Sequence, residues 1–256
     1  MEEKILSRDV LIVRDGVKIN TMKNKFKNIV VLTGAGISAE SGIRTFRDSN
    51  GLWEDHAIED VASPEGFQRD PSLVYRFYNA RREQLYNDQR VAPNAAHKAL
   101  AKLQRDTNAN FTLITQNVDN LHERGGSENV LHMHGRLDQM RCTSCASVHP
   151  SPVAFNEDSS CPSCDTKGSL RPNIVWFGEM PFYLEQAAQE LERSDLFMCI
   201  GTSGLVYPAA QFVSLTNPKC MRVEFNLNHT PASSQFSEVV HGPAGQTVPD
   251  FIESLK

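Results

Sequence analysis

The sequence lacks the features that would place the protein in a membrane or make it a general binder of nucleic acid. No apolar run approaches the roughly 20 residues that a membrane-spanning helix needs. Residues 1–16 begin with acids and have charges between their apolar residues, unlike a signal peptide. The net charge of −5 argues against a general nucleic-acid binder, although it leaves room for local binding of a cationic protein segment. We therefore expect a cytoplasmic protein with no membrane contact.

Apolar runs alternate with segments of helical character along most of the chain. In 256 residues that are 40% hydrophobic and 22% charged, this alternation predicts an α/β fold with a Rossmann-like doubly wound parallel sheet. The length leaves room for a small insert beside one large domain. The expected strands are 29–32, 111–115, 130–134, 195–200 and 221–225, with an extended segment at 174–177; the expected helices are 70–86, 94–105, 181–193, 208–215 and a terminal one from residue 249.

A turn of small residues follows the first apolar run. Gly34, Gly36 and Ala39 have G-x-G-x-x-A spacing, which lets backbone N–H groups approach a pyrophosphate at the start of a helix. A tight structural turn is the alternative. An ordinary dehydrogenase has an acidic residue about 20 positions later, after a second strand. Here that distance falls on residues 53–55, and no apolar run precedes them. We therefore predict that a dinucleotide binds, but outside the usual hydride-transfer frame.

Four of the six cysteines form two C-x-x-C pairs with 15 residues between them. This is the spacing of a four-cysteine zinc ribbon. A reducing compartment disfavours disulfides, and a redox C-x-x-C needs no second pair. Because four thiolates fill the zinc coordination shell, the metal is expected to be structural. The predicted ligands are Cys142, Cys145, Cys161 and Cys164.

Small or amide-bearing residues follow four of the expected strands. They are found at 34–39, 116–119, 201–203 and at Asn226. Ligands of a doubly wound sheet bind outside the carboxyl ends of its strands, so these four segments predict one binding site. Any single one of them can also be explained as a turn or a helix cap.

Two histidines alternate in the expected strand 130–134. His132 and His134 would share one face of that strand, close to the first C-x-x-C pair. Since the zinc already has four ligands, a general base is the better functional interpretation, with a buried core histidine as the alternative. Composition and spacing do not decide between the two residues.

Taken together, these motifs resemble the sirtuin family. The similarity runs from about Ile29 to the C-terminus, and within the family it is to the bacterial CobB type, which groups with sirtuins that remove acidic acyl chains. It is carried by GAGISAESGIRTFR, TQNVDNLHERGG, HMHG, the paired C-x-x-C turns, RPNIVWFGEMP, GTSGLVYPAA and FNLN. Sirtuins are NAD-dependent protein lysine deacylases with a Rossmann domain and a small zinc-binding domain.

The resemblance implies that NAD is consumed as a co-substrate. In sirtuins the acyl-lysine carbonyl oxygen attacks C1′ of the nicotinamide ribose, nicotinamide leaves and an alkylimidate forms. A histidine before glycine, here His134, then accepts a proton from the ribose hydroxyls so that the 2′-oxygen attacks the imidate carbon. Asn117 and Asp119 match residues that hold the nicotinamide ribose and carboxamide and are counted with His134 as catalytic. Gln116 matches a ribose contact, and Phe46 matches the ring that shields C1′.

The resemblance also implies which residues contact the two substrates. Val175, Trp176, Phe177 and Gly178 match the segment that pairs with the acyl-lysine peptide by β-augmentation. The expected NAD contacts are Gly34, Ala35, Gly36, Ser38, Ala39, Ile43, Phe46, Arg47, Trp53, Gln116, Asn117, Asp119, Gly201, Thr202, Ser203, Asn226, Leu227 and Ala244.

Tyr78 and Arg81 bear on the choice of acyl group. They are three residues apart in an expected helix and so share a face. In the acidic-deacylase type, Tyr-x-x-Arg lines the acyl pocket, where a guanidinium and a phenol can hold a succinyl or malonyl carboxylate. The alternative is that Arg81 and Arg82 form a solvated helix face.

The expected organisation is an N-terminal arm (1–25) followed by a catalytic unit (26–256). In that unit the NAD-binding domain comprises about 26–52, 88–138 and 170–256, with a helical insert at about 53–87 and a zinc-binding insert at about 139–169. The expected products are deacylated lysine, nicotinamide and O-acyl-ADP-ribose, and the partners are acyl-lysine segments of proteins. The alternatives are a protein mono-ADP-ribosyltransferase and a zinc-ribbon interaction module.

Overall fold

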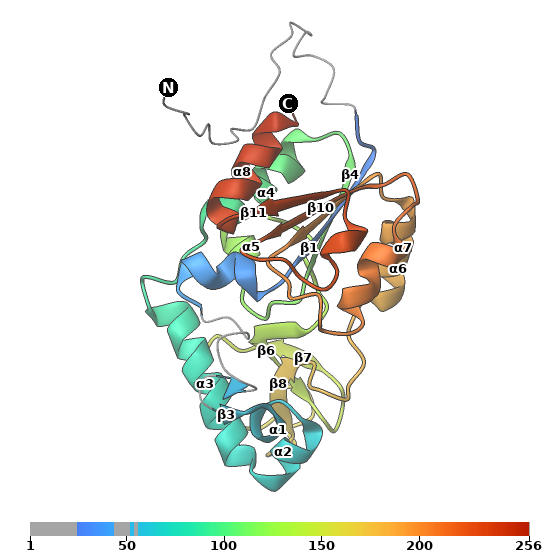
Figure 1. The fold of residues 1–256 in the computed structure, drawn as a ribbon. Helices are drawn as coiled ribbons and strands as arrows, with labels where there is room; N and C mark the ends of the chain where they lie inside the picture. The colour runs from blue at the N-terminus through green and yellow to red at the C-terminus, as the bar shows by residue number, and fades with distance from the viewer. Residues whose placement is uncertain (1–24, 44–51, 54–55, 256) are drawn as a thin grey trace, which may run out of the picture.

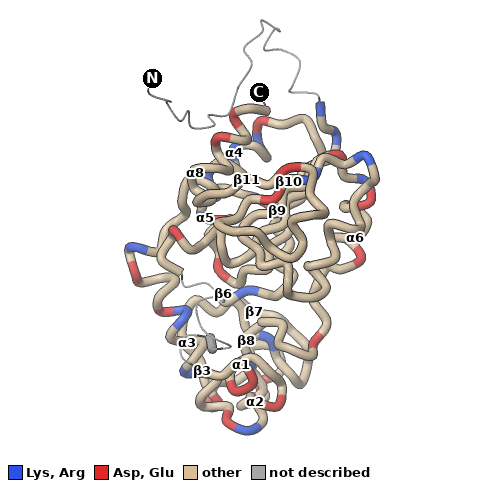
Figure 2. The backbone as a smooth tube through the Cα atoms, viewed as in Figure 1, with Lys and Arg blue, Asp and Glu red and all other residues tan. Residues whose placement is uncertain are grey.

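The computed structural model describes residues 25–43, 52–53 and 56–255, which form a larger and a smaller part (Figure 1). The expected N-terminal arm lies outside the described residues except for Lys25, and so do Phe46 and Arg47. Among the described helices, none has the length and apolar character needed to cross a membrane. Acidic and basic residues are interspersed over the described backbone and do not separate by sign (Figure 2).

The larger part is built on a six-stranded sheet in which all neighbouring strands are parallel. The predicted doubly wound α/β fold is thereby confirmed. The chain runs from β1 to β4 on one side and later to β9 on the other, which puts the switch point at the carboxyl end of β1. In spatial order the strands are β11 (Glu238–His241), β10 (Met221–Asn226), β9 (Leu196–Ile200), β1 (Asn28–Thr33), β4 (Asn110–Thr115) and β5 (Leu131–His132).

Alternate residues of β1 pack against two layers of helices. Ile29 and Val31 belong to one buried cluster, and Val30 and Leu32 belong to another on the opposite face. Because β1 is buried on both faces, its sequence is continuously apolar. The first cluster includes residues of α4 (Ala95–Asp106) and α8 (Ala244–Ser254), and the second includes residues of α6 (Leu184–Arg193) and α7 (Phe212–Leu215), which lie on the other side of the sheet in Figure 1.

The smaller part combines an antiparallel sheet with three helices. Its sheet has the order β7-β6-β8 and extends beyond the segment expected as the zinc-binding insert, since it begins at Gly135 and ends at Ile174. The elements are β2 (Leu52–Trp53), β3 (His56–Ala57), α1 (Ile58–Val61), α2 (Pro64–Arg69), α3 (Pro71–Asn87), β6 (Gly135–Cys142), β7 (Val148–Pro150) and β8 (Leu170–Ile174). Short helices in the loops of the larger part are η1 (Ala35–Ser41), α5 (Leu121–Arg124), η2 (Ala209–Gln211) and η3 (Ser233–Gln235).

The expected extended segment at 174–177 is regular strand only at its first residue. Strand β8 ends at Ile174, and a turn follows. Beyond the strand, the Glu179 carboxylate accepts the backbone N–H of Trp176 at 2.8 Å, where a neighbouring strand would otherwise supply an acceptor. The expected strand 130–134 is likewise shorter, since β5 covers only Leu131–His132.

The terminal helix does not begin at Pro249. Helix α8 starts at Ala244, and Pro249 lies inside it. Its first turn is fixed from elsewhere in the chain, because the Glu40 carboxylate accepts the backbone N–H of Gly245 at 2.6 Å. An acidic group at a helix N-terminus is favourable, but the sequence does not show that η1 delivers it there.

Candidate functional site

The loops after β1, β9 and β10 are hydrogen-bonded to one another at the carboxyl edge of the main sheet. The N–H of Gly36 donates to the Gly201 carbonyl at 2.8 Å, and the N–H of Gly201 donates to Phe225 at 2.9 Å. The Asn226 side-chain amide donates to the Thr202 carbonyl at 2.7 Å. The structure thus brings these small-residue loops together, in agreement with the expectation of one site.

Glycine is required where the loop after β1 touches the loop after β9. A Cβ on Gly36 would lie 2.6 Å from Cα of Gly201. A Cβ on Gly201 would lie 2.5 Å from the backbone nitrogen of Ile37, and Gly201 also has a φ of +63°, which side chains disfavour. The G-x-G pattern therefore supports a close approach of two loops in addition to a ligand.

The loop after β4 joins this cluster through buried side chains. Asn117 donates through Nδ2 to the Gly34 carbonyl at 3.1 Å and to Ser38 Oγ at 3.2 Å. Ser38 Oγ donates to Asp119 Oδ2 at 3.0 Å, and Gln116 Nε2 donates to Thr202 Oγ1 at 3.0 Å. Burial raises the pKa of the Asp119 carboxyl, although the Ser38 hydroxyl and a backbone N–H oppose the rise.

The two histidines have different surroundings. His132 is bound at both nitrogens, since Nδ1 lies 3.1 Å from the Asn117 carbonyl and Nε2 lies 2.7 Å from a Glu123 carboxylate oxygen. Among the described residues, His134 has a hydrogen-bond partner only at Nδ1, which lies 3.1 Å from the Gln116 carbonyl oxygen. A carbonyl partner makes Nδ1 the protonated nitrogen and leaves Nε2 as the basic one. Burial lowers the pKa of His134, against the effect of that hydrogen bond.

The segment after β8 lies beside His134. The backbone N–H of Val175 donates to the His134 carbonyl at 2.9 Å, and that of Phe177 donates to Ala62 at 2.9 Å. Trp176 is buried, whereas the Phe177 side chain is 52% exposed. Gly178 follows with a φ of +88°, which turns the chain away.

Tyr78 and Arg81 lie one turn apart on α3. The Tyr78 hydroxyl oxygen accepts a hydrogen bond from Trp176 Nε1 at 3.0 Å, which connects α3 to the segment after β8. Arg81 is half-buried, and its guanidinium lies 4.2 Å above the Phe77 ring. Arg82 does not belong to a solvated face. It is 2% exposed, and its Nε donates to the Leu137 carbonyl of β6 at 3.0 Å.

The four cysteines of the two C-x-x-C motifs come together in the smaller part. All four Sγ atoms lie within 4.8 Å of one another, with 3.7 Å between Cys142 and Cys164 and 3.8 Å between Cys145 and Cys161. Thiolates about 2.3 Å from a zinc ion at the centre of a tetrahedron would be about 3.8 Å apart. The residues therefore fit one structural Zn²⁺, and the complete thiolate set leaves no position for a substrate.

The remaining expected NAD contacts are spread around the same loops. Ala35 and Ala39 lie in η1, Ala244 begins α8, and Ser203 follows Thr202. Ile43 packs against the core of the smaller part, and Leu227 is 62% exposed. Phe46 and Arg47 are outside the described residues, and Trp53 enters only through the backbone of β2.

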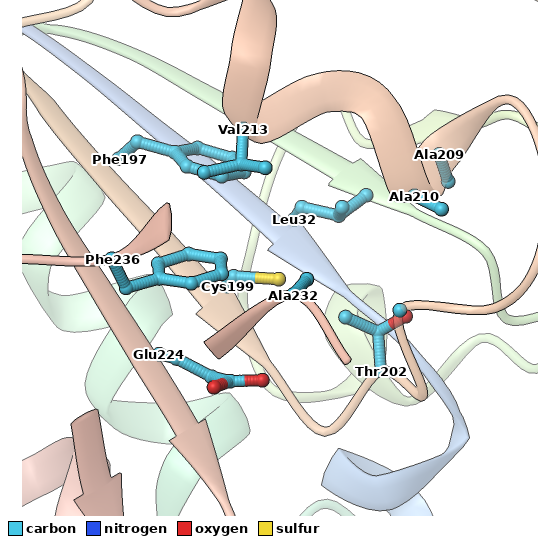
Figure 3. A pocket seen from close by; sticks show the side chains of 11 residues that line it. Leu32, Phe197, Cys199, Thr202, Ala209, Ala210, Val213, Glu224, Ala232 and Phe236 are labelled. Atoms are coloured by element: carbon cyan, nitrogen blue, oxygen red, sulfur yellow. The ribbon is translucent and has the colours of Figure 1, made fainter. Parts of the chain in front are cut away.

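A pocket lies beneath the loop that carries Thr202. Its walls are mostly apolar, and the buried side chains of Cys199 and Glu224 face it together with Phe236 (Figure 3). The Glu224 carboxylate accepts a hydrogen bond from Thr230 at 2.6 Å. Burial raises the pKa of the Cys199 thiol, which therefore stays protonated as a core residue.

Sequence reasoning missed Arg171 and Glu179. Arg171 donates through two nitrogens to the Glu179 carboxylate at 2.6 and 3.0 Å, and its guanidinium lies 3.3 Å from the centre of the Trp176 ring. Both residues are within the motif RPNIVWFGEMP, but they are eight residues apart, and their contact cannot be predicted unless the chain is known to turn between them. The only signal in the sequence was that two opposite charges flank an aromatic residue, which is compatible with an ion pair around it.

The chain is similar over most of its length to proteins of one family. The model of the Sir2 family matches residues 34–208. The NAD-dependent protein deacylase of Bdellovibrio bacteriovorus is 57% identical over 227 residues, which cover 89% of this chain and 96% of the relative. The NAD-dependent protein deacylase of Escherichia coli strain K12 is 49% identical over 249 residues, covering 97% of this chain and 88% of the relative.

Solved structures agree in fold. A Sir2 homologue in complex with NAD superposes with a TM-score of 0.81 at 39% identity, over 92% of this chain and 91% of its own. A structure described as Sir2 with a p53 peptide and NAD⁺ superposes with a TM-score of 0.72 at 30% identity, over 91% of this chain and 95% of its own.

Proposed function

This chain belongs to the Sir2 family, and we propose that it is an NAD-dependent protein lysine deacylase acting on acetyl-lysine and on succinyl- or malonyl-lysine. Its products would be deacylated lysine, nicotinamide and O-acyl-ADP-ribose. The observation that carries the proposal is the position of His134. The His134 ring is held by the loop after β4, which leaves Nε2 as the basic nitrogen. The backbone carbonyl of His134 accepts a hydrogen bond from the segment expected to bind the peptide.

NAD would bind along the carboxyl edge of the main sheet. The loops of Gly34–Ser38, Gly201–Ser203 and Asn226 are joined there by hydrogen bonds between their own groups, at the edge of a doubly wound sheet where ligands bind. Asn117, Asp119 and Ser38 form the inner wall, which we assign to the nicotinamide ribose and carboxamide.

The first chemical step would break the bond between C1′ and nicotinamide nitrogen. The acyl carbonyl oxygen forms a new bond to C1′, and the bonding electrons leave with nicotinamide, which becomes neutral. No protein base is needed until a ribose hydroxyl must become a nucleophile. His134 would then accept that proton at Nε2 while Nδ1–H continues to donate to Gln116.

The peptide would bind along residues 175–178. These residues lie outside the regular sheet, and their backbone is held by His134, Ala62 and Glu179. An extended peptide can add to such a segment by main-chain hydrogen bonds, with the acyl-lysine side chain directed toward Trp176 and Tyr78. The guanidinium of Arg81 on the same helix would attract an acyl group that ends in a carboxylate.

The direct test is incubation of the zinc-loaded protein with NAD and an acetyl-lysine or succinyl-lysine peptide. We expect free nicotinamide and O-acyl-ADP-ribose in equal amounts, detected by mass spectrometry, and no peptide product without NAD. If label from NAD instead remained on protein, the chain would be a mono-ADP-ribosyltransferase. If neither product formed while the protein bound DNA in a salt-dependent way, the interaction-module alternative would replace the proposal.

Replacement of Arg81 by methionine tests the acyl preference separately. Methionine keeps the length of the side chain and removes its charge, so kcat/KM should fall far more for succinyl-lysine than for acetyl-lysine. Equal losses on the two peptides would rule out the carboxylate contact.

A cytoplasmic location completes the proposal, and it is supported by the unpaired thiols of a zinc site.

A further inference from the structure

Trp176 connects the segment assigned to the peptide with the helix assigned to the acyl group. Its side chain is 2% exposed, and its indole Nε1 donates to the Tyr78 hydroxyl oxygen at 3.0 Å. Tyr78 is 1% exposed and lies one helical turn before Arg81. The indole N–H of Trp176 therefore donates to Tyr78, which is one of the two side chains that would hold an acidic acyl chain.

This contact determines how the Tyr78 hydroxyl is oriented. A phenol has one hydrogen to donate, and its oxygen accepts. Because the indole N–H occupies an acceptor position, the hydroxyl hydrogen is directed away from Trp176. Burial raises the pKa of Tyr78, so that hydrogen is retained. A carboxylate only accepts hydrogen bonds and benefits from this orientation, whereas an acetyl group ends in a methyl and does not.

Trp176 is itself held in place from two directions. The Arg171 guanidinium lies 3.3 Å from the centre of its ring, and the Glu179 carboxylate accepts its backbone N–H at 2.8 Å. Arg171 and Glu179 pair with each other through two hydrogen bonds, and Arg141 donates to Glu179 at 3.0 Å. The position of the indole N–H is thus fixed before any substrate binds.

From this geometry we infer that Trp176 is a specificity-determining positioning residue, which orients Tyr78 to donate to the carboxylate of an acidic acyl-lysine. Arg171 and Glu179 support it by fixing the indole. The inference rests on the proposed deacylase function and adds a residue whose effect is on the choice between acyl groups.

The experiment compares kcat/KM for succinyl-lysine and acetyl-lysine peptides of one sequence. Trp176→Phe keeps an aromatic ring over Arg171 and removes the N–H, and we expect the succinyl-to-acetyl ratio to fall about ten-fold, the size of one buried hydrogen bond. Tyr78→Phe should lower the ratio at least as much, and the double variant should lower it no further than Tyr78→Phe alone, because without the Tyr78 hydroxyl the indole N–H has nothing to orient. Incorporation of benzothienylalanine at position 176 keeps the full ring volume without the N–H and should give the same result.

Tyr75→Phe is the matched control. Tyr75 is also buried on α3, but its hydroxyl donates to the Leu170 carbonyl and has no contact with Trp176 Nε1, so the ratio should not change. A ratio unchanged in both Trp176 variants would overturn the inference, and so would additive effects of Tyr78→Phe and Trp176→Phe. If Arg81→Met also left the ratio unchanged, the acyl preference itself would be wrong. A selective effect of Arg81→Met alone would remove only the role of Trp176.

Discussion

Nδ1 of His134 lies 3.1 Å from the carbonyl oxygen of Gln116, in the loop that also carries Asn117 and Asp119. One contact therefore sets both the tautomer of the proposed base and its position relative to the proposed nicotinamide site. Because the partner of His134 is a backbone carbonyl, a substitution of Gln116 would not remove this hydrogen-bond acceptor. The consequences are measurable through the pH dependence of the reaction.

The acid limb of the rate profile should lie below the ordinary histidine pKa of about 6.5. A base works only when neutral, and burial lowers the pKa of His134, so the neutral form persists further into acid. As pH falls through that lowered pKa, kcat/KM should decline. The measurement is kcat/KM between about pH 5 and 8. Residual activity of His134→Asn should lack this limb, and a limb that persisted would be assigned to Asp119, whose pKa burial raises.

Gly201→Ala should weaken NAD binding. The added Cβ would lie 2.5 Å from the Ile37 nitrogen, and the φ of +63° disfavours any side chain, so the loops after β1 and β9 must separate. We expect the KM for NAD to rise by about ten-fold or more, equivalent to roughly 1.4 kcal/mol. Gly42→Ala is the control, because Gly42 has a φ of +82° but its nearest neighbour is 3.8 Å away. An equal rise in both variants would attribute the effect to backbone strain alone.

Arg82→Met should destabilise the smaller part. The substitution leaves the Leu137 carbonyl without its donor and removes the 2.6 Å contact to Asn79. Burial lowers the pKa of Arg82 to about 10, because the charged guanidinium has lost most of its contact with water. The free energy of unfolding in urea should fall by roughly 2–4 kcal/mol. Arg76→Met on the exposed face of α3 should change it by less than about 0.5 kcal/mol.

Removal of zinc should reduce activity although no proposed step uses the metal. A four-thiolate site supplies folding energy to the sheet β7-β6-β8, whose strands β6 and β8 adjoin His134 and Val175. Cys145→Ser should lower zinc content, the melting temperature and kcat together, measured by atomic absorption, calorimetry and peptide assay. Cys220→Ser, in the core of the larger part, should keep one zinc per chain. Full activity in a zinc-free protein would contradict this role of the metal.

Local patterns predicted most of the main sheet and the loops at its carboxyl edge. Strands β1 and β9 have continuous apolar runs, β4 and β10 have apolar residues interrupted by polar ones, and the small or amide-bearing residues after these strands lie at the same edge of the parallel sheet. Strand β11 was missed because it is a four-residue edge strand, only half-buried, with no such run. The cysteine spacing was sufficient for the zinc site because both C-x-x-C turns are local.

The features that were not predictable depend on side chains that meet across the fold. Glu40 reaches α8 from more than 200 residues away, and Glu179 accepts a backbone N–H just beyond β8. Arg82 looks like a surface residue until β6 is placed beside α3. Composition and spacing did not separate His132 from His134, and only the family resemblance assigned the base to His134; the contact of Glu123 with His132 is another feature that the sequence does not show.

The hydrogen bond between Val175 and His134 has a topological consequence. His134 and Val175 flank the forty-residue excursion that contains β6, β7, β8 and the cysteine turns. Their hydrogen bond therefore holds the two ends of this excursion together. An excursion with closed ends can change length or composition at its tip while the parent sheet keeps its geometry. The exposed turn around residues 156–159 is therefore a natural place to insert a reporter or a tether for directing the protein to chosen targets.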